Sequence, residues 1–499
     1  MKRILSGKDM KKVDSYTINK IGIPSLALIE RAALGIKNVL IKQFQDKETS
    51  IVAICGIGNN GADALAVLRM LYIEGYTKIA VCIIGDEDGA TDEFKVQNNV
   101  IKNLNIKSIQ QNEISEYYVV IDGIFGIGLN RVVEGQYAGL INNVNSENHY
   151  VISVDIPSGI NGDSGNVMGV AIQANETITF GDYKLGIILY PGAEYSGRVT
   201  VADIGFPSEA YNECEILKSY EVCDMPRVKK DRPLDSNKGT FGKLLIIAGN
   251  EEMSGAACLA TSAAFSMGCG LVRVATPEVN RVIIASTIPE AIVYSFAQDK
   301  DKLLEDISNL IECSDVILAG PGMGVSKRTQ DLLQLVLESK KPAVIDADAI
   351  NTISKMDGLR QLLHENVIIT PHLGEMSRLN GKGIDEIKYS IVSTCQDVAK
   401  QYGIICVLKG ARTVISDKKG QTFINMTGNS GMAKAGSGDV LAGMIAGLLS
   451  THYDVLVAAS LGAYLHGVAG DESRDEWGEM AMVPRDMIKA IERILKENQ

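Results

Sequence analysis

Two glycine-rich segments hold the residue types best suited to chemistry. They are GIGNNGAD (residues 56–63) and GNSGMAKAGSGD (residues 428–439), and an apolar helix-forming run accompanies each. The first free N–H groups of such a helix, together with its dipole, favour an anion such as a phosphate. Asp439 adds a carboxylate, which suits a base beside a transferring phosphoryl group. The structural alternative is that the glycines only shape turns and that Asp439 only favours a first helical turn.

Two further loops in the first half carry aspartates directly after a predicted strand. IDGIFGIGLNR contains Asp122, and VDIPSGINGDSG contains Asp155 and Ser158. A single strand-end aspartate is commonly a helix cap or a turn former. In parallel α/β sheets, however, ligands bind where strands end and helices begin. Three such loops on consecutive strands therefore indicate one ligand-binding crevice.

The elements that must position these loops are short strands rich in β-branched residues. In the first half they end at Cys55, Gly85, Asp122 and Asp155. A second series comprises KLLIIAG, LVRVATP, DVILAGPG, PAVIDAD, NVIITPH and IICVLKG. The spacing leaves room for a helix between strands, which predicts parallel sheets covered on both faces. No residue-level repeat relates the two halves, so we expect two different α/β domains.

The length of 499 residues exceeds one ordinary hydrophobic core. Pro226 and Pro233 interrupt a charged stretch between the two strand series, which places the boundary near residues 212–230 and predicts domains at 1–215 and 225–499. Residues 254–272 carry no charge, but Gly268 and Gly270 predict a buried helix and then a strand, not a membrane span. Residues 440–470 are interpreted in the same way.

Composition limits the partners and the compartment. With 49 basic and 61 acidic residues the formal charge is −12, which disfavours nucleic acid but not a small nucleotide. Nine scattered cysteines form no C-x-x-C pair or His-paired cluster, so zinc is disfavoured. The first residues lack the apolar core of a signal peptide. We therefore expect reduced thiols, a cytoplasmic location and no membrane association.

The first 210 residues or so resemble the NAD(P)HX epimerase family through GNNGAD, DGIFGIGLNR, DIPSGINGDSG and PGAEYSGRVTVADIGFP. The resemblance implies a Rossmann-like three-layer α/β/α domain that interconverts the R and S hydrates of NADH and NADPH at ring carbon six. It implies that Asn60, Asp122 and Ser158 bind a potassium ion and that Asp155 transfers a proton. The implied contacts to the hydrated cofactor are Asn59, Asn60, Gly61, Ala62, Asp63, Gly126, Ile127, Gly128, Leu129, Asn130, Arg131, Val132 and Asp155.

One departure from the family pattern bears on activity. The family usually has GNNGGDG, whereas this chain has GNNGADA with Ala62 and Ala64. Methyl groups there would crowd a backbone that needs positive φ or that touches the ligand. The alternative to an active epimerase is therefore a non-catalytic ligand-binding module.

The second half, from about residue 230, resembles the ADP- or ATP-dependent NAD(P)HX dehydratases of the ribokinase-like superfamily. The motifs are KGTFGKLLIIAGN, MSGAACLAT, LAGPGMG, VIDADAI, TPHLGEMSRL, KGARTVI and the GSGD segment. The resemblance implies a ribokinase-like α/β domain in which Ala256, Gly322, His372 and Asp439 contact the hydrated cofactor. The implied adenine-nucleotide site comprises Lys409, Gly410, Ala411, Arg412, Thr413, Asn429, Gly436, Ser437 and Gly438.

In the implied reaction, Asp439 accepts the hydroxyl proton while magnesium bridges the nucleotide phosphates. Phosphoryl transfer to the hydroxyl oxygen makes a better leaving group, which the ring nitrogen expels.

ADP is favoured over ATP because bacterial members of the family generally use it. The partners are NADHX, NADPHX and ADP or ATP, and we expect a homo-oligomer. The alternative function is a kinase of a small alcohol. Two of the residues also have purely structural interpretations: the Lys434 ammonium could be solvated, and His372 could be a hydrogen-bonded residue at a strand end.

Overall fold

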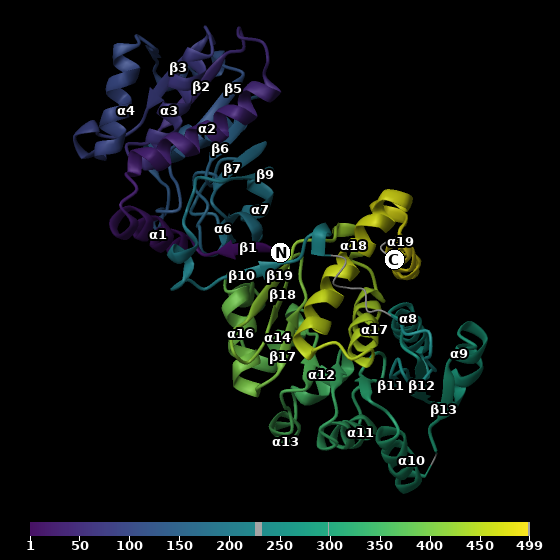
Figure 1. The fold of residues 1–499 in the computed structure, drawn as a ribbon. Coiled ribbons are helices and arrows are strands. Elements are labelled where there is room, and N and C mark those ends of the chain that lie inside the picture. The colour runs from purple at the N-terminus through teal and green to yellow at the C-terminus, as the bar shows by residue number, and fades with distance from the viewer. Residues whose placement is uncertain (225–231, 298, 498–499) are drawn as a thin grey trace. The chain divides into compact units, whose positions relative to one another are not determined.

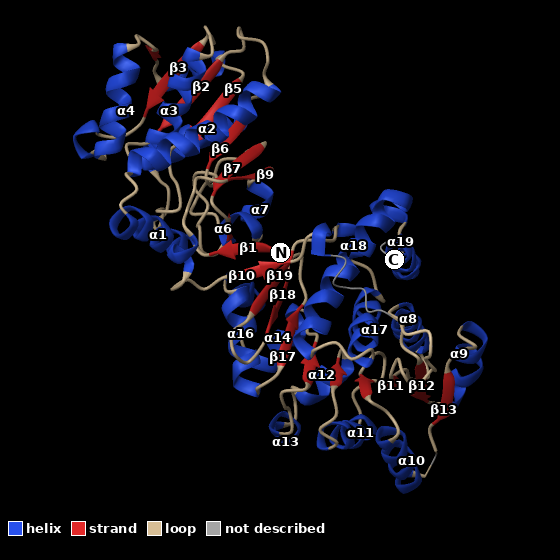
Figure 2. Ribbon diagram, viewed as in Figure 1, coloured by secondary structure: helices blue, strands red, loops and turns tan. Residues whose placement is uncertain are grey.

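The computed structural model describes residues 1–224, 232–297 and 299–497 (Figure 1). The chain divides into two compact units, Lys2–Leu217 and Lys218–Gln499, and Met1 groups with the second. Helices and strands alternate along both units (Figure 2). Pro226 of the predicted linker lies outside the described residues.

The N-terminal unit is built on a parallel sheet with the strand order β4-β3-β2-β5-β6-β7-β9. Each predicted strand of the first half is present, which confirms the α/β class. Chain order reverses direction at β2 and β5, so the loops after these two strands border one crevice. The strands are β2 (Ile51–Cys55), β3 (Ile79–Ile83), β4 (Lys107–Ser108), β5 (Val119–Gly123), β6 (Tyr150–Val154), β7 (Glu176–Phe180) and β9 (Arg198–Ala202).

Helices cover both faces of this sheet and make it three-layered. Ile51, Ala53 and Cys55 of β2 join one buried cluster with α2, α3 and α4, whereas Val52 and Ile54 join another with α5. Burial on both faces explains why the strand is apolar without alternation. Outside the main sheet, β1 (Lys2–Leu5) pairs with β8 (Tyr183–Lys184). The helices are α1 (Gly7–Tyr16), α2 (Ser25–Gln43), α3 (Asn59–Ile73), α4 (Asp92–Asn103), α5 (Gly135–Ser146), α6 (Leu185–Ile188) and α7 (Gly192–Tyr195).

The C-terminal unit contains a second sheet with the order β13-β12-β11-β14-β15-β16-β17-β18-β19-β10. Strands β13 to β17 are parallel, and β17, β18 and β19 pair antiparallel. All six strands predicted here are present. The strands are β10 (Leu217–Ser219), β11 (Lys243–Ile247), β12 (Leu271–Thr276), β13 (Ile292–Ser295), β14 (Val316–Ala319), β15 (Ala343–Ile345), β16 (Val367–Ile369), β17 (Ile405–Leu408), β18 (Thr413–Ser416) and β19 (Thr422–Asn425).

One face of this sheet packs against four helices, α8 (Ser254–Ser266), α17 (Ser437–Ser450), α18 (Val455–Ala481) and α19 (Pro484–Glu497). Leu244 and Ile246 of β11 join that cluster, while Leu245 and Ile247 are buried on the other face. The uncharged run of residues 254–272 forms α8 and the start of β12, as predicted. The remaining helices are α9 (Arg281–Thr287), α10 (Lys300–Glu312), α11 (Lys327–Glu338), α12 (Asp348–Ile353), α13 (Asp357–Gln361), α14 (Leu373–Asn380), α15 (Ile384–Tyr389) and α16 (Ile391–Tyr402).

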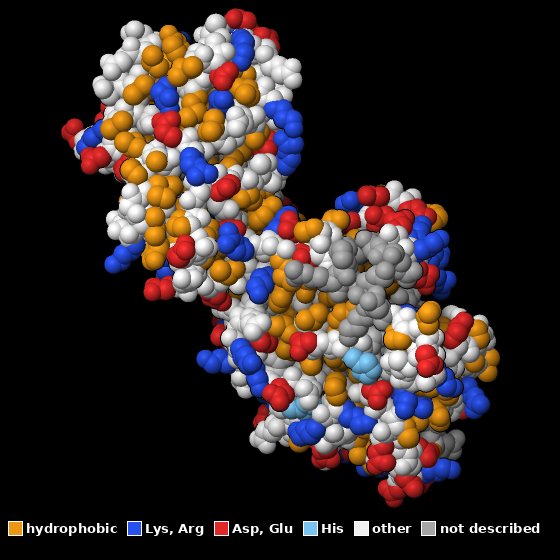
Figure 3. Space-filling model, in the orientation of Figure 1, with side chains coloured by type: hydrophobic (Ala, Val, Ile, Leu, Met, Phe, Trp, Pro, Cys, Tyr) orange, Lys and Arg blue, Asp and Glu red, His pale blue; other side chains and the backbone are white. Residues whose placement is uncertain are grey.

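Among the described residues, no helix combines the length and the apolar character needed to cross a bilayer. On the face drawn in Figure 3, lysine and arginine side chains are scattered among acidic ones. All nine cysteines are free thiols. The exclusion of nucleic acid as a partner stays a prediction.

Candidate active sites

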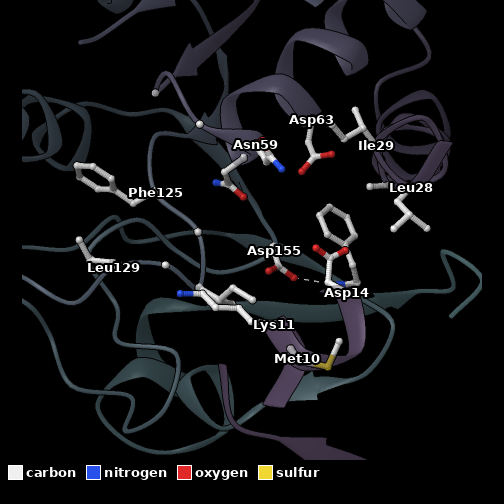
Figure 4. A pocket seen from close by; sticks show the side chains of 18 of the residues that line it. Met10, Lys11, Asp14, Leu28, Ile29, Asn59, Asp63, Phe125, Leu129 and Asp155 are labelled. Carbon is white, nitrogen blue, oxygen red and sulfur yellow. Dashed lines mark hydrogen bonds between the residues drawn. The ribbon is translucent and has the colours of Figure 1, made fainter. Parts of the chain in front are cut away.

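A cavity of about 550 Å³ lies where β2, β5, β6 and β7 of the N-terminal unit end (Figure 4). This volume is in the range of small-molecule sites. Helices α1, α2 and the first turn of α3 complete its wall. The lining residues are Met10, Lys11, Asp14, Ile18, Ser25, Leu28, Ile29, Ala32, Gly56, Ile57, Gly58, Asn59, Asn60, Asp63, Ile124, Phe125, Gly126, Ile127, Gly128, Leu129, Asn130, Arg131, Tyr137, Asp155, Phe180, Lys184, Ile204 and Phe206.

Most of the predicted cofactor contacts line this cavity, but three do not. Gly61 and Ala62 are buried within α3, and the side chain of Val132 is 55% exposed away from the lining. Because α3 begins at Asn59, residues 59, 60 and 63 share the cavity side while 61 and 62 turn toward the core. The implied contacts at Gly61, Ala62 and Val132 are therefore not supported by the geometry.

The expectation that alanines at 62 and 64 would crowd the site is wrong. Both alanines are helical, fully buried and absent from the cavity lining. Neither is among the described residues with positive φ. Ala64 packs instead against Gly123, where an added Cβ would lie 2.6 Å from the Ala64 Cβ. These methyl groups fill the core between α3 and β5 and leave the cavity open.

Asp122 and Ser158 form a buried polar cluster beside the cavity. The Ser158 hydroxyl donates to Asp122 Oδ1 at 2.5 Å, and the Ser158 amide donates to Oδ2 at 2.9 Å. Ser153 also donates to Oδ2, at 2.8 Å. Burial raises the pKa of Asp122, and the hydrogen bonds from Ser158 oppose that rise.

The third implied potassium ligand, Asn60, lies against the loop after β5, where a Cβ added at Gly126 would be 3.0 Å from Asn60 Oδ1. Its Nδ2 is buried and has no hydrogen-bond partner among the described residues. Rotating the amide by 180° would place Oδ1 at that point, so an unpartnered nitrogen here fits an oxygen that faces a cation. The Phe125 carbonyl, 3.2 Å from the Ser158 hydroxyl, adds a further oxygen. Such a set of oxygens suits a hard cation.

Asp155 is held in a strained and well-defined position. It has a φ of 66°, which a non-glycine residue rarely adopts. Its Oδ1 accepts from Lys184 Nζ at 2.5 Å, from the Thr179 hydroxyl at 3.1 Å and from the Phe180 amide at 3.1 Å. The Lys184 side chain is only 1% exposed. A buried ion pair of this kind fixes the carboxylate at the edge of the cavity.

In the C-terminal unit, the GSGD segment forms the N-terminus of α17. Gly436 has a φ of 96° and precedes the first turn, which Asp439 occupies. Residues 436–439 are all half-buried. The Ser437 amide donates to the Lys434 carbonyl at 3.2 Å, whereas the amides of Gly436 and Gly438 have no backbone acceptor in the described part of the chain. A Cβ added at Gly438 would lie 3.2 Å from Lys409 Nζ, which shows how closely this lysine approaches the helix N-terminus. The geometry is that of an anion site.

The charges around Asp439 set its proton affinity. Burial, and then the negative charge of Asp346, raise the pKa of Asp439 to about 6, while Lys409 opposes the rise. Lys409 Nζ lies 2.7 Å from Asp346 Oδ1. Burial alone would lower the pKa of Lys409, but Asp346 and Glu375 outweigh it and raise that pKa. At neutral pH the site therefore combines a carboxylate at Asp439 with a firmly protonated lysine.

Asp346 and Glu375 are functional candidates that the sequence did not single out. Asp346 is 1% exposed and also accepts from the Thr370 hydroxyl at 2.6 Å. The next residue, Ala347, has a φ of 50°, so the backbone is strained directly beside the carboxylate. Burial raises the pKa of Glu375 to about 7. Only the strand-end position of Asp346 was visible in the sequence.

Of the four implied substrate contacts, Ala256 and Asp439 lie in the first turns of α8 and α17, His372 directly precedes α14, and Gly322 is in the loop after β14. A Cβ added at Gly322 would lie 3.2 Å from the Ala256 Cβ, so these two residues are neighbours. His372 lies at the start of α14, where its Nδ1 accepts from the Gly374 amide at 2.9 Å. His372 is therefore a hydrogen-bonded residue at a strand end, as the structural interpretation predicts. It also forms a β-bridge with Lys409, whose side chain lies beside the start of α17.

The implied nucleotide segment is anchored to α18. The Gly428 amide and Asn429 Nδ2 both donate to Asp471, at 2.9 and 3.1 Å. Lys434 donates to the backbone carbonyls of Glu479, Met480 and Met482. The interpretation of Lys434 as a solvated ammonium is therefore wrong, because the lysine caps carbonyls at the end of α18. The other implied segment, residues 409–413, comprises the turn after β17 and the first residue of β18, Thr413.

Comparisons with known proteins match both units. A family described as NAD(P)H-hydrate dehydratase matches residues 244–493, and one described as YjeF-related protein N-terminus matches residues 25–186. The bifunctional NAD(P)H-hydrate repair enzyme Nnr of Moorella thermoacetica is 34% identical over 99% of this chain and 96% of its own length. The protein of the same name from Thermofilum pendens is 32% identical over 98% of this chain and 95% of its own length.

A solved structure agrees with the fold of the second unit. A ribokinase-like superfamily protein from Enterococcus faecalis is 32% identical and has a TM-score of 0.51, covering 56% of this chain and 96% of that chain. Fold and site thus define the C-terminal unit as a ribokinase-like α/β domain. The whole chain belongs to the family of bifunctional NAD(P)H-hydrate repair enzymes.

Proposed function

We propose that this chain repairs hydrated NADH and NADPH by two activities. An epimerase in residues 1–215 interconverts the R and S hydrates, and a dehydratase in residues 225–499 restores the reduced cofactor from the S hydrate at the expense of ADP or ATP. The observation that carries the proposal is the half-exposed start of α17, where Asp439 and Lys409 flank free backbone amides. Membership of the repair-enzyme family supports it.

In the dehydratase, Asp439 takes the proton of the substrate hydroxyl as its oxygen attacks the terminal phosphorus of the nucleotide. The amides of Gly436 and Gly438 and the dipole of α17 stabilise the charge on the transferring group. The ring nitrogen then expels phosphate from carbon six, and loss of a proton from carbon five restores the reduced nicotinamide. The products are NADH or NADPH, phosphate, and AMP from ADP or ADP from ATP.

Magnesium fits this site because Asp346 Oδ2, 3.9 Å from the position of a Cβ added at Gly438, offers the carboxylate oxygen that the ion prefers. When bound with the nucleotide, the ion would neutralise part of the phosphate charge. Lys409 supplies a second positive charge from the protein itself. We propose ADP as the preferred phosphoryl donor.

Purified S hydrate tests the dehydratase directly. With magnesium and ADP or ATP, we expect the absorbance of reduced nicotinamide to return with one phosphate released per cofactor. Asp439→Ala should abolish the return, whereas Asp385→Asn, which changes an exposed aspartate of the same unit, should not. A stable phosphorylated hydrate that accumulates without elimination would identify a small-alcohol kinase instead.

The epimerase half of the proposal is supported by the cavity beside Asp155. Inverting a carbon that bears a hydroxyl next to nitrogen requires reversible bond breaking assisted by proton transfer. A carboxylate fixed by Lys184 at the cavity edge suits that task. A potassium ion held by Asn60, Asp122 and Ser158 would order the loops after β5 and β6. A cytoplasmic location and a homo-oligomeric state remain predictions from the sequence.

Pure R hydrate without nucleotide tests this activity separately. We expect chromatography to show the S hydrate appearing until both epimers are present. Ser158→Ala should weaken the dependence of the rate on potassium concentration. If the R hydrate stays unchanged in the presence of active dehydratase, the first unit is a ligand-binding module.

A further inference from the structure

Three carboxyl groups from different elements face the cavity of the N-terminal unit. Asp14 comes from α1, Asp63 from α3 and Asp155 from the loop after β6 (Figure 4). Asp63 is 8% exposed and has no hydrogen-bond or ion-pair partner in the described part of the chain. Asp155, in contrast, accepts three hydrogen bonds, one of them from the Lys184 ammonium. Two carboxyl groups in one cavity therefore have opposite environments.

These environments favour opposite protonation states. An isolated buried carboxylate is costly, so Asp63 holds its proton and presents an unpaired O–H donor to the cavity. Burial, followed by the charges of Asp155 and Asp14, raises the pKa of Asp63 well above its ordinary value. The Lys184 ammonium compensates the charge of Asp155 at 2.5 Å. Two titratable groups kept in different states are the pattern of an acid and a base acting together.

We propose that Asp63 is the proton donor and Asp155 the proton acceptor of the epimerisation, with Asp14 as a positioning residue that keeps Asp63 protonated. The proposal rests on the epimerase function proposed above and assigns its chemistry to named groups. Asp14 belongs to α1, which lies outside the family match at residues 25–186.

The proposed step balances without an added reactant. Asp155 takes the proton of the carbon-six hydroxyl, the bond between carbon six and the ring nitrogen breaks, and that nitrogen takes the proton of Asp63. The hydroxyl carbon becomes an aldehyde and the ring nitrogen an N–H group. Rotation about the bond between carbons five and six presents the other aldehyde face to the nitrogen. The reverse proton transfers then close the ring as the other epimer and restore both carboxyl groups.

The pH dependence of this step depends on every charged group that faces Asp63. The charged groups that line the cavity with Asp63 are Asp14 and Lys11 on α1, Arg131, Asp155 and Lys184. Glu93 on α4 adds a further carboxylate, which accepts from the cavity residue Ser25. Among these groups, the negative charges of Asp155 and Asp14 disfavour ionisation of Asp63 and raise its pKa. The rate should therefore fall as rising pH ionises Asp63.

The test measures conversion of pure R hydrate by the full-length protein and its Asp63→Asn variant. We expect kcat to fall roughly 10²- to 10⁴-fold, the usual contribution of a general acid, with KM nearly unchanged. The variant should also lose the alkaline decline of the rate. Asp92→Asn, which alters an exposed aspartate at the start of α4, is the matched control and should behave as wild type. Dehydration of pure S hydrate by the same preparations verifies that each protein is folded.

Asp14→Asn supplies an independent readout of the positioning role. It should move the alkaline decline to lower pH while preserving the rate at acidic pH. If the wild type converts R hydrate and Asp63→Asn does so with unchanged kcat, the acid assignment is wrong and the epimerase function stands. A decline that stays in place in Asp14→Asn overturns the role of Asp14. A wild type that converts no R hydrate overturns both the function and this inference.

Discussion

Replacing Asp439 by asparagine should stabilise the C-terminal unit while it destroys the dehydratase activity. The pKa of Asp439 is raised from 3.8 to about 6 by burial and by Asp346. One pKa unit corresponds to about 1.4 kcal/mol, so ionising this half-buried group costs up to roughly 3 kcal/mol more in the folded than in the unfolded protein. The asparagine side chain would carry no charge and would avoid that cost.

The sign of the effect depends on pH. Above pH 6 the folded protein must hold an unfavourable carboxylate, so the destabilisation is complete there. Below pH 3.8 Asp439 is protonated in both states, and the destabilisation vanishes. The stability advantage of Asp439→Asn should therefore shrink from up to roughly 3 kcal/mol at pH 8 to roughly 1 kcal/mol at pH 4.5.

Urea unfolding followed by Trp477 fluorescence measures this advantage. Trp477 is the single tryptophan of the chain and belongs to α18, so it reports on the C-terminal unit. At the same time, the rate of dehydration should fall roughly 10²- to 10⁴-fold, as for loss of a general base. A variant that is no more stable than wild type at pH 8 would show that burial and Asp346 do not destabilise the charged form of Asp439.

Three further outcomes are expected. The wild-type dehydration rate at saturating substrate should fall about tenfold between pH 7 and pH 5. The reason is that the ionised fraction of Asp439, with a pKa of about 6, falls from about nine-tenths to one-tenth over this range. A rate that does not change with pH would exclude Asp439 as the base. Lys409→Met should lower the free energy of unfolding by roughly 3 kcal/mol, because the buried carboxylate of Asp346 loses its partner. This is the low end for buried pairs, chosen because the Lys409 side chain is 18% exposed. An unchanged urea midpoint would contradict this expectation. Combining Ala62→Gly and Ala64→Gly should lower the free energy of unfolding by about 1–2 kcal/mol, since both alanines are buried in α3. The epimerase kcat should not rise. A large gain in kcat would show that the two methyl groups obstruct the cavity.

The strands and the loops that follow them could be predicted because their signals are local. Runs such as SIVAIC are apolar without alternation because both faces of β2 are buried, and the glycine-rich turn after it leads directly into α3. Asn59, Asp63 and Asp155 could be assigned to one crevice because parallel strands end at the same edge of a sheet. The GSGD segment combined an apolar helix with a first-turn carboxylate, which the structure reproduces at α17.

Other site residues could not be predicted because tertiary packing selects them. Lys184 meets Asp155 across 29 residues, and a lone lysine in FGDYKLG gives no periodic signal. Asp14 belongs to α1, and no sequence motif indicates that this helix packs over the cavity. The burial of the Ala62 side chain in the core could not be predicted, because the first residue of α3 decides which side chains face the cavity. Helix starts are not fixed by sequence pattern to within one residue.

We propose that this one chain returns both hydrates to usable cofactor. The most direct measurement supplies an equal mixture of R and S hydrates with magnesium and ADP or ATP and follows each epimer by chromatography. We expect both epimers to disappear and reduced nicotinamide to be recovered in full. Consumption of the S hydrate alone, with the R hydrate persisting unchanged, would contradict the claim.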